Sequence, residues 1–146
     1  VAEGSGITLV HENEKEIYGD IPRRCLEIVR AVDSPALRLT WDNANFVQCG
    51  VRPYTEGYPL LSPHVDYLQV KDARFADGVV VPAGAGDGQF RESMRAFAAA
   101  GFEGFASLEP HLQLGHALGG FSGPENWRRA HAAFVRVLRE EGIAYA

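Results

Sequence analysis

The eight residues VDYLQVKD (65–72) carry the clearest structural pattern in this chain. Apolar and polar side chains alternate from Val65 to Val70, and the run then ends in Lys71 and Asp72. This is typical of a short β-strand that leads into a polar loop. Similar apolar runs that end in polar residues recur at ITLV (7–10), ALRLTW (36–41) and GFASL (104–108). The sequence therefore predicts four short strands.

The segments after the first two strands have features of helices and loops. Asp20 is expected to be the N-cap of a first helix, with Pro22 in its first turn. Apolar residues at spacings of four, three and four predict its buried face, which consists of Ile21, Cys25, Ile28 and Val32. A stretch rich in Gly and Pro (49–62) is expected to form a loop with one short helix near 55–61.

Two further helices have clearer boundaries. One is marked by a face of four apolar residues, Phe90, Met94, Phe97 and Ala98, and is expected to stop at Gly101. Before the last helix, SGPE (122–125) matches a capping box with Pro inside it. The predicted buried stripe of this helix consists of Trp127, Ala130, His131, Phe134, Val137 and Leu138, and Gly142 is expected to end it.

The resulting order is β-α-β-α-β-α-β-α, four units of about 30 to 40 residues that form one domain over residues 1–146. Short strands joined by helices must cross over the sheet, so the strands are expected to be parallel and the fold class is α/β. Two architectures are compatible with this order. One is a small open doubly wound sheet, and the other is half of an eight-unit barrel, which usually needs about 250 residues.

Composition excludes several classes of function. The net charge of −5 argues against a nucleic-acid surface, which is normally basic. No apolar run reaches the roughly 20 residues of a membrane helix. The two cysteines, Cys25 and Cys49, have neither metal-ligand spacing nor disulfide density, so we expect a cytoplasmic protein with reduced thiols. The chain opens on Val1 instead of Met, and we therefore expect it to be a fragment.

Each predicted strand ends in a residue that can bind a cation. These residues are Glu12, Asp42, Gln69 (with Asp72 just beyond it) and Glu109. A single acidic residue after a strand is more often a helix N-cap or a solvated loop residue. Four successive strand ends are harder to explain in this way, because the carboxyl ends of parallel strands form one rim. Carboxylates that meet there repel one another, and a divalent cation removes the repulsion. Oxygen ligands favour Mg²⁺ or Mn²⁺, and an added histidine would widen the choice to Zn²⁺ or Co²⁺.

Four motifs, in order and at the spacing of barrel repeats, carry a resemblance to a known family. They are HEN (11–13), WDNANF (41–46), QVKDA (69–73) and SLEPH (107–111). Together they make the chain similar to the xylose isomerase-like barrel family of sugar isomerases and epimerases, which also includes inosose dehydratase. The resemblance implies that the chain is the C-terminal half of a (β/α)₈ barrel, strands five to eight, with the first four units absent.

The resemblance also implies roles for individual residues. Glu12, Asp42 and Glu109 match metal ligands of the family, and Gln69 stands where the family usually has a histidine. An amide oxygen can bind Mg²⁺ or Mn²⁺, but it is a weaker ligand and a poor partner for Zn²⁺. Asn45 lies where some epimerases place a substrate-contacting histidine. Lys71 and His111 are further candidates for substrate contact or for orienting a ligand, although a solvated lysine and a loop histidine beside Pro110 are the simpler interpretations.

In the family, two glutamates flank the substrate and move a proton from carbon while the metal polarises the carbonyl and stabilises the enediolate. By resemblance, Glu12 and Glu109 take this catalytic role on a small carbohydrate or hydroxy-keto substrate. Two alternatives stay open. One is a dehydratase of the inosose or dehydroshikimate type on the same metal platform, and the other is a degenerate, non-catalytic sugar-binding barrel, which Gln69 favours. A related DNA-repair endonuclease would need more histidines and a basic surface.

The remaining polar and aromatic residues give weaker indications. The loop Gly84–Gly88 lacks the features of a nucleotide-binding loop, and it is expected to be a rim loop, either plain or with amides that face an anionic or polyhydroxylated substrate. Trp41 and Phe46 are expected to form an apolar wall for a sugar or, for Trp41, part of the core. The other histidines are assigned by position: His64 to the opposite rim, His131 to the core or an interface, and His116 to a loop.

Four barrel units leave two open strand edges and one uncovered inner face, and such edges pair readily with another chain. We therefore expect the chain to associate, either with its own N-terminal half or with a second copy, and not to exist as a stable lone monomer.

Overall fold

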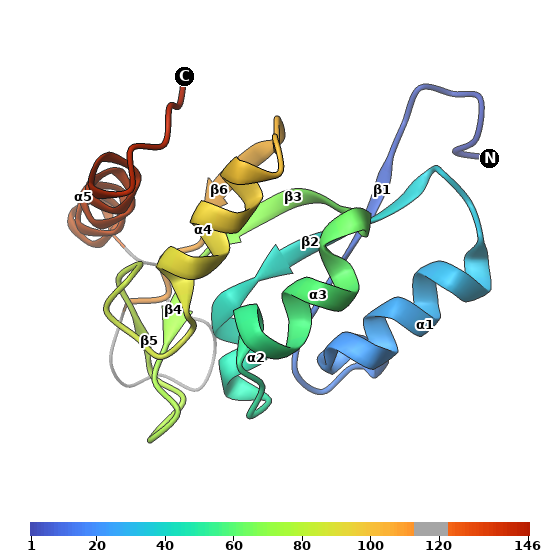
Figure 1. Ribbon diagram of the computed structural model, residues 1–146. Helices are drawn as coiled ribbons and strands as arrows, with labels where there is room; N and C mark the ends of the chain where they lie inside the picture. Colours follow the sequence, from blue (N-terminus) through green and yellow to red (C-terminus); the bar gives the residue numbers. More distant parts are fainter. Residues whose placement is uncertain (113–122) are drawn as a thin grey trace.

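The computed structural model describes residues 1–112 and 123–146. A four-stranded parallel sheet forms its centre, with strand order β1-β2-β3-β6 (Figure 1). Its strands are β1 (Leu9–Glu12), β2 (Leu37–Asp42), β3 (Val65–Val70) and β6 (Phe105–Leu108). All four predicted strands are present, and the first lies two residues later than expected. The parallel pairing brings the ends of β1, β2, β3 and β6 to one edge of the sheet.

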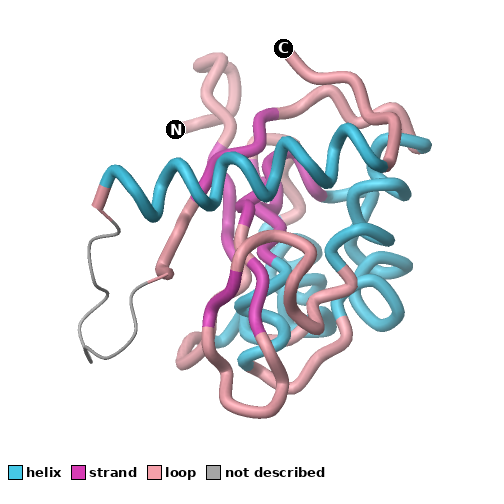
Figure 2. Tube along the Cα trace, turned by 90° about the vertical axis from the view of Figure 1, so that its left-hand side faces the viewer, coloured by secondary structure: helices cyan, strands magenta, loops and turns pink. Residues whose placement is uncertain are grey.

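Helices cover one face of this sheet, as the two perpendicular views show (Figures 1 and 2). The α-helices are α1 (Pro22–Val32), α2 (Asn43–Gln48), α3 (Tyr58–Leu61), α4 (Phe90–Ala99) and α5 (Pro124–Glu140). Shorter turns are η1 (Tyr18–Asp20), η2 (Pro53–Gly57) and η3 (Ser62–His64). A two-stranded hairpin, β4 (Asp72–Ala73) with β5 (Val80–Val81), follows β3. The sequence did not predict α2 or the hairpin.

The core lies between the sheet and the helices. Trp41 of β2 is buried there, with its ring edge against Phe46 at 5.2 Å and Phe97 at 5.4 Å between centroids. Edge-to-face packing of this kind adds about 0.5–1.5 kcal/mol per pair to the burial of the rings. Trp41 and Phe46 are therefore core residues, and the expectation that they form a wall for a sugar is wrong.

The expected details of α1 are partly wrong. The N-cap is Ile21, and Asp20 instead accepts a hydrogen bond from Arg24 Nη1 at 2.8 Å. The buried face consists of Pro22, Cys25, Leu26 and Val29, whereas Val32 is exposed. Cys25 belongs to two apolar stripes on this helix. When the helix packs against the sheet, the stripe with Leu26 and Val29 is buried instead of the one that the spacing predicted.

The last helix begins at Pro124 with Gly123 as its N-cap and no side-chain cap, and Ser122 of the predicted capping box lies outside the described residues. Ala130, Val137 and Leu138 are buried as predicted. Trp127 and His131 are exposed instead and stack on each other with ring centroids 5.2 Å apart. His131 is therefore not a core residue, and the alternative that it lies at an interface stays a prediction.

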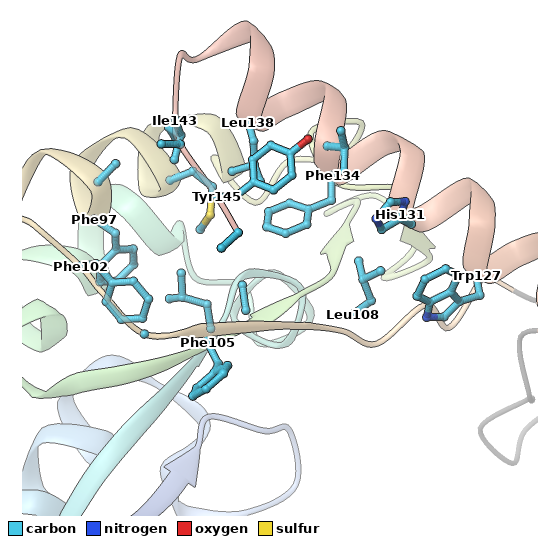
Figure 3. Close-up of a pocket in the computed structure, with 18 residues that line it drawn as sticks. Phe97, Phe102, Phe105, Leu108, Trp127, His131, Phe134, Leu138, Ile143 and Tyr145 are labelled. Atoms are coloured by element: carbon cyan, nitrogen blue, oxygen red, sulfur yellow. The ribbon is translucent and has the colours of Figure 1, made fainter.

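An apolar groove of about 690 Å³ separates α5 from β6 and α4. We call it the α5–β6 groove. Figure 3 shows Phe134 and Tyr145 pointing into it, with Trp127 and His131 at one end and Phe105 projecting from the other side of β6. On the sheet face that no helix covers, Val10 is 45% exposed and Phe105 is 78% exposed. Both the groove and the open face are what a half barrel leaves uncovered.

Candidate metal centre and acid–base site

Three carboxylates meet at the edge where the parallel strands end. Glu12 is the last residue of β1, Asp42 is the last residue of β2, and Glu109 follows β6 directly. One oxygen from each lies within 4.8 Å of the others. The register explains this convergence, because the four parallel strands run side by side to a common edge. The α5–β6 groove includes none of these three residues among those that line it, so the larger cavity is not the candidate site.

Asp42 is completely buried and uses its two oxygens differently. Oδ1 accepts the backbone N–H of Asn45 at 2.8 Å and so caps α2, which is the structural role that a lone acidic residue after a strand usually has. Oδ2 accepts no hydrogen bond from the described residues. Burial raises the pKa of Asp42 to about 7, against the opposing charge of Lys71. Asp42 is therefore both a helix cap and a buried acid whose second oxygen faces the Lys71 ammonium, 3.3 Å away.

Two asparagines fix the ends of β1 and β2 to each other. Asn13 donates from Nδ2 to Asp42 O and accepts from Asp42 N, both at 2.9 Å. Asn45 donates from Nδ2 to Glu12 Oε1 at 3.2 Å and to the carbonyl of Asn13 at 2.9 Å. Asn45 is buried, so these contacts support a role in positioning Glu12 more than direct contact with a substrate. The sequence reasoning missed Asn13, whose position next to Glu12 was its only signal.

Lys71 lies inside the carboxylate cluster. Its Nζ is 2.5 Å from Glu109 Oε2 and 3.3 Å from Asp42 Oδ2, and the residue is only 4% exposed. Burial by itself lowers the pKa of Lys71, but Asp42 and Glu109 raise it, and the net shift is upward. The interpretation of Lys71 as a solvated strand-end lysine is wrong.

Glu109 is held between two basic groups. Lys71 contacts Oε2, and His111 Nε2 lies 3.2 Å from Oε1. Across the cluster, burial raises the pKa of Glu12, the charge of Glu109 raises it further, and Lys71 opposes the shift. The two glutamates thus differ in environment, because Glu109 contacts an ammonium and an imidazole, whereas Glu12 is hydrogen-bonded to the neutral amide of Asn45.

Gln69 lies beside the cluster on β3. Its Oε1 accepts a hydrogen bond from Ser107 Oγ of β6, and its side chain also hydrogen-bonds to Glu12. Gln69 therefore links β3 to β6 through Ser107 and to β1 through Glu12. Its amide oxygen is occupied by a protein donor in this arrangement.

Asp72 does not join the cluster. Its carboxylate accepts the backbone N–H groups of Gly84, Gly86 and Gly88 at 3.0–3.1 Å, together with that of Ala73. A Cβ on Gly86 would lie 2.5 Å from Asp72 Oδ1, and one on Gly88 would lie 2.6 Å from it, so both positions need glycine. The expectation that these amides face a substrate is wrong, because a buried side chain of the same protein satisfies them.

The histidines occupy different parts of the molecule. His64 is in η3, before β3 begins, so it lies at the edge of the sheet opposite the carboxylates, as predicted. His111 is next to Glu109, and His116 lies outside the described residues.

The residues of the cluster fit a divalent cation. Three carboxyl groups meet in a partly buried place, and one ammonium, that of Lys71, contacts two of them. Asp42 Oδ2 is buried and accepts no hydrogen bond, and the cation that faces it among the described residues is the Lys71 ammonium, 3.3 Å away. The donors are oxygen atoms, which suits Mg²⁺ or Mn²⁺.

These features define a half barrel of parallel βα units with an acidic site at its strand ends. The family model of the xylose isomerase-like TIM barrel matches residues 1–138, and the chain belongs to this family. Curated proteins give no match. Among the residues that the structure describes, no helix is long and apolar enough to cross a membrane.

Solved structures with the same fold include a D-tagatose 3-epimerase-like protein, with 18% identity and a TM-score of 0.70 over 94% of this chain and 49% of that one. A probable 3-DHS dehydratase, AsbF from Bacillus anthracis, has 19% identity and a TM-score of 0.66 over 88% and 49%. A xylose isomerase-like TIM barrel protein from Mycobacterium smegmatis in complex with magnesium has 20% identity and a TM-score of 0.65 over 93% and 45%. The chain spans about half the length of these structures.

Proposed function

We propose that the protein is a metal-dependent isomerase or epimerase that acts on a small sugar, or on a sugar phosphate, by moving a proton at a carbon next to a carbonyl group. The observation that carries this proposal is the meeting of Glu12, Asp42 and Glu109 within 4.8 Å at the ends of three strands. The family and the epimerase structures of the same fold support it.

Glu12, Asp42 and Glu109 would hold the cation, with Gln69 as a fourth ligand once its amide leaves Ser107. A divalent cation in such a site polarises a substrate carbonyl and so makes the neighbouring C–H more acidic. Glu12 and Glu109 are the bases in this proposal. Burial and the charge of Glu109 raise the pKa of Glu12, which favours Glu12 as the group that carries the proton, and Glu109 lies in contact with Lys71 and His111.

Lys71 and His111 are the proposed contacts for substrate oxygens. Both touch Glu109, so a hydroxyl or carbonyl oxygen that reaches either one also reaches that base. Asn45, buried behind Glu12, would act on the substrate through the orientation of Glu12.

The proposal is tested with a panel of ketoses in D₂O, with product identity and deuterium incorporation as readouts. Glu12→Gln and Glu109→Gln are each expected to lower kcat by about 10²–10⁴-fold, because general acid–base groups contribute on that scale. The matched control is Glu103→Gln, an exposed glutamate just before β6, which should leave kcat unchanged. Deuterium exchange that survives in both site variants would refute the assignment.

A dehydratase is the second candidate. The fold of AsbF and the contact between His111 and Glu109 favour it, because eliminating water needs an acid beside the base to protonate the leaving hydroxyl. Inososes and dehydroshikimate belong in the same panel, and loss of water from the product distinguishes a lyase from an epimerase. A non-catalytic sugar-binding barrel predicts binding without turnover, and no loss of function in Glu109→Ala.

We also propose that further βα units, on the same polypeptide or on a second copy, cover the open sheet edges and the α5–β6 groove. The exposed Val10 and Phe105 and the 690 Å³ apolar groove support this, since contiguous apolar surface of this kind marks an association site.

A further inference from the structure

The ammonium of Lys71 occupies a position among the very oxygens that a divalent cation would need. It lies 2.5 Å from Glu109 Oε2 and 3.3 Å from Asp42 Oδ2. These are two of the three residues whose oxygens meet within 4.8 Å. A lysine is a compact point charge on a flexible stem, so it can neutralise such a cluster and can also swing out of it.

Asp42 shows why the ammonium and a metal compete. Its Oδ1 is committed to the N–H of Asn45 and caps α2, so it cannot turn toward the cluster without uncapping the helix. Only Oδ2 is left, and it is the oxygen that faces Lys71. A cation bound by Asp42 must use the oxygen on which the ammonium already acts.

The other donors are engaged in a similar way. Glu109 has Lys71 on Oε2 and His111 on Oε1, and Gln69 Oε1 accepts from Ser107. Protein groups therefore satisfy most of the donors that a metal would recruit. Glu12, whose recorded partners are the neutral amides of Asn45 and Gln69, is the carboxylate that is most easily turned to a new ligand.

We propose that Lys71 is a tethered cation that holds the carboxylates of this site together when no divalent ion is bound, and that it must leave Asp42 when an ion binds. The proposal rests on the metal site of the proposed function. Lys71 then sets the affinity of the site for metal, because part of the binding free energy is used to displace an attraction already present within the protein.

The direct test compares Mn²⁺ binding by the wild-type protein with Lys71→Met, followed by the electron paramagnetic resonance signal of free Mn²⁺. Removing a positive charge from the site should tighten binding by at least about tenfold, given the size of charge interactions at 4 Å. The matched control is Arg38→Met, which deletes a cation on the same sheet face, four residues before Asp42 on β2 and paired with Asp66. Arg38 is about 13 Å along the strand from the site, beyond the screening length, so affinity should stay within about twofold.

The outcomes separate the inference from the function on which it rests. Unchanged or weaker binding by Lys71→Met, with normal binding by the wild type, would overturn the tethered-cation role and leave the metal site intact. Weaker binding is the result expected if Lys71 merely orients Glu109 for the metal. If neither protein binds Mn²⁺, both the inference and the proposed metal site are wrong.

A second measurement uses the wild-type protein, so it does not depend on whether the variant folds. Lys15 and Lys71 are the two lysines of the chain, and Lys15 is exposed. Acetylation by an N-hydroxysuccinimide ester, followed by mass spectrometry, should label Lys15 rapidly and Lys71 slowly in a chelating buffer. Mn²⁺ should raise the labelling rate of Lys71 several-fold and leave that of Lys15 unchanged. Labelling of Lys71 that stays constant or falls on adding Mn²⁺ would contradict displacement of its ammonium.

Discussion

The two ends of the sheet face that no helix covers differ in polarity and in how fully their side chains are partnered. At the carboxyl ends, Glu12, Asp42 and Glu109 are held by Lys71 and by the amides of neighbouring strands. Toward the amino ends, Val10 and Phe105 are exposed, and Tyr67 lies beside Phe105 with ring centroids 6.4 Å apart. Among the described residues, the carboxylates are thus held by side chains of neighbouring strands, whereas the apolar side chains at the other end are exposed.

Because of this difference, metal binding should depend on the carboxylate end of the sheet face, whereas association and apolar burial should depend on the other end. The donors proposed for a cation all come from strands of this chain, so metal binding can be tested on it directly. Burial of the exposed Val10 and Phe105 by further βα units, as proposed, would add to stability at about 25 cal/mol per Å² of apolar surface. Changes at the two ends should therefore affect different measurements.

The largest effect on stability is expected at the polar end. Asp42→Ala removes the cap of α2 and leaves the buried Lys71 paired with Glu109, so the free energy of unfolding should fall by about 1–3 kcal/mol. The matched control is Asp66→Ala, which breaks the more exposed ion pair with Arg38 and should cost less than about 1 kcal/mol. Urea unfolding in chelating buffer measures both, and equal losses would show that the cluster is no more stabilising than a surface pair.

The same residue predicts a dependence on pH. The pKa of Asp42 is raised to about 7 in the folded state from 3.8, so the folded protein binds a proton that the unfolded chain releases between these values. Without metal, the contribution of Asp42 to stability should be fully present below pH 3.8 and should be lost as the pH rises toward 7. Asp42→Asn keeps an oxygen for the cap and removes the titration, so its unfolding free energy should vary less over this range. An identical pH profile in the two proteins would contradict the assignment to Asp42.

The convergence of Glu12, Asp42 and Glu109 could be predicted because it needs only two facts, that the strands are parallel and that each ends in a carboxylate. Parallel strand ends share an edge whatever the side chains around them do. The position of Lys71 could have been inferred in part, since Tyr67, Gln69 and Lys71 alternate onto one face of β3 and its continuation. Its burial between two acids depends on β2 and β6 flanking β3 on either side, which the sequence of β3 does not contain.

Other features depended on contacts between distant residues. The amides of Gly84, Gly86 and Gly88 are satisfied by Asp72, 12 to 16 residues earlier, and the spacing of glycines does not indicate which group they bind. In α1, two apolar stripes are nearly equivalent in the sequence, and only docking on the sheet selects Leu26 and Val29 over Ile28 and Val32. Periodicity predicts that a helix is amphipathic more reliably than it predicts which side is buried.

At the apolar end, Phe105→Asp should act on association and leave the site unaffected. If further βα units or a second copy cover this face, the wild-type chain should self-associate at micromolar concentration, and the substitution should weaken association by about tenfold or more, as for a buried aromatic anchor. Light scattering measures association, and Mn²⁺ binding should stay unchanged. The matched control is Leu60→Ser, an exposed apolar residue on α3. A monodisperse wild-type monomer would contradict the proposed association.

The smallest effect is expected from Gln69→His, which places a nitrogen ligand at the polar end. Imidazole binds Zn²⁺ and Co²⁺ better than an amide oxygen does, so the ratio of Zn²⁺ to Mg²⁺ affinity should rise by several-fold to tenfold. The gain is limited, because the substitution also removes the acceptor of the Ser107 hydroxyl and the hydrogen bond to Glu12. Isothermal titration with each metal measures the ratio, and Ser107→Ala alone controls for the lost hydroxyl contact. An unchanged ratio would mean that residue 69 does not reach the ion, and the proposed ligand set would then reduce to the three carboxylates around Lys71.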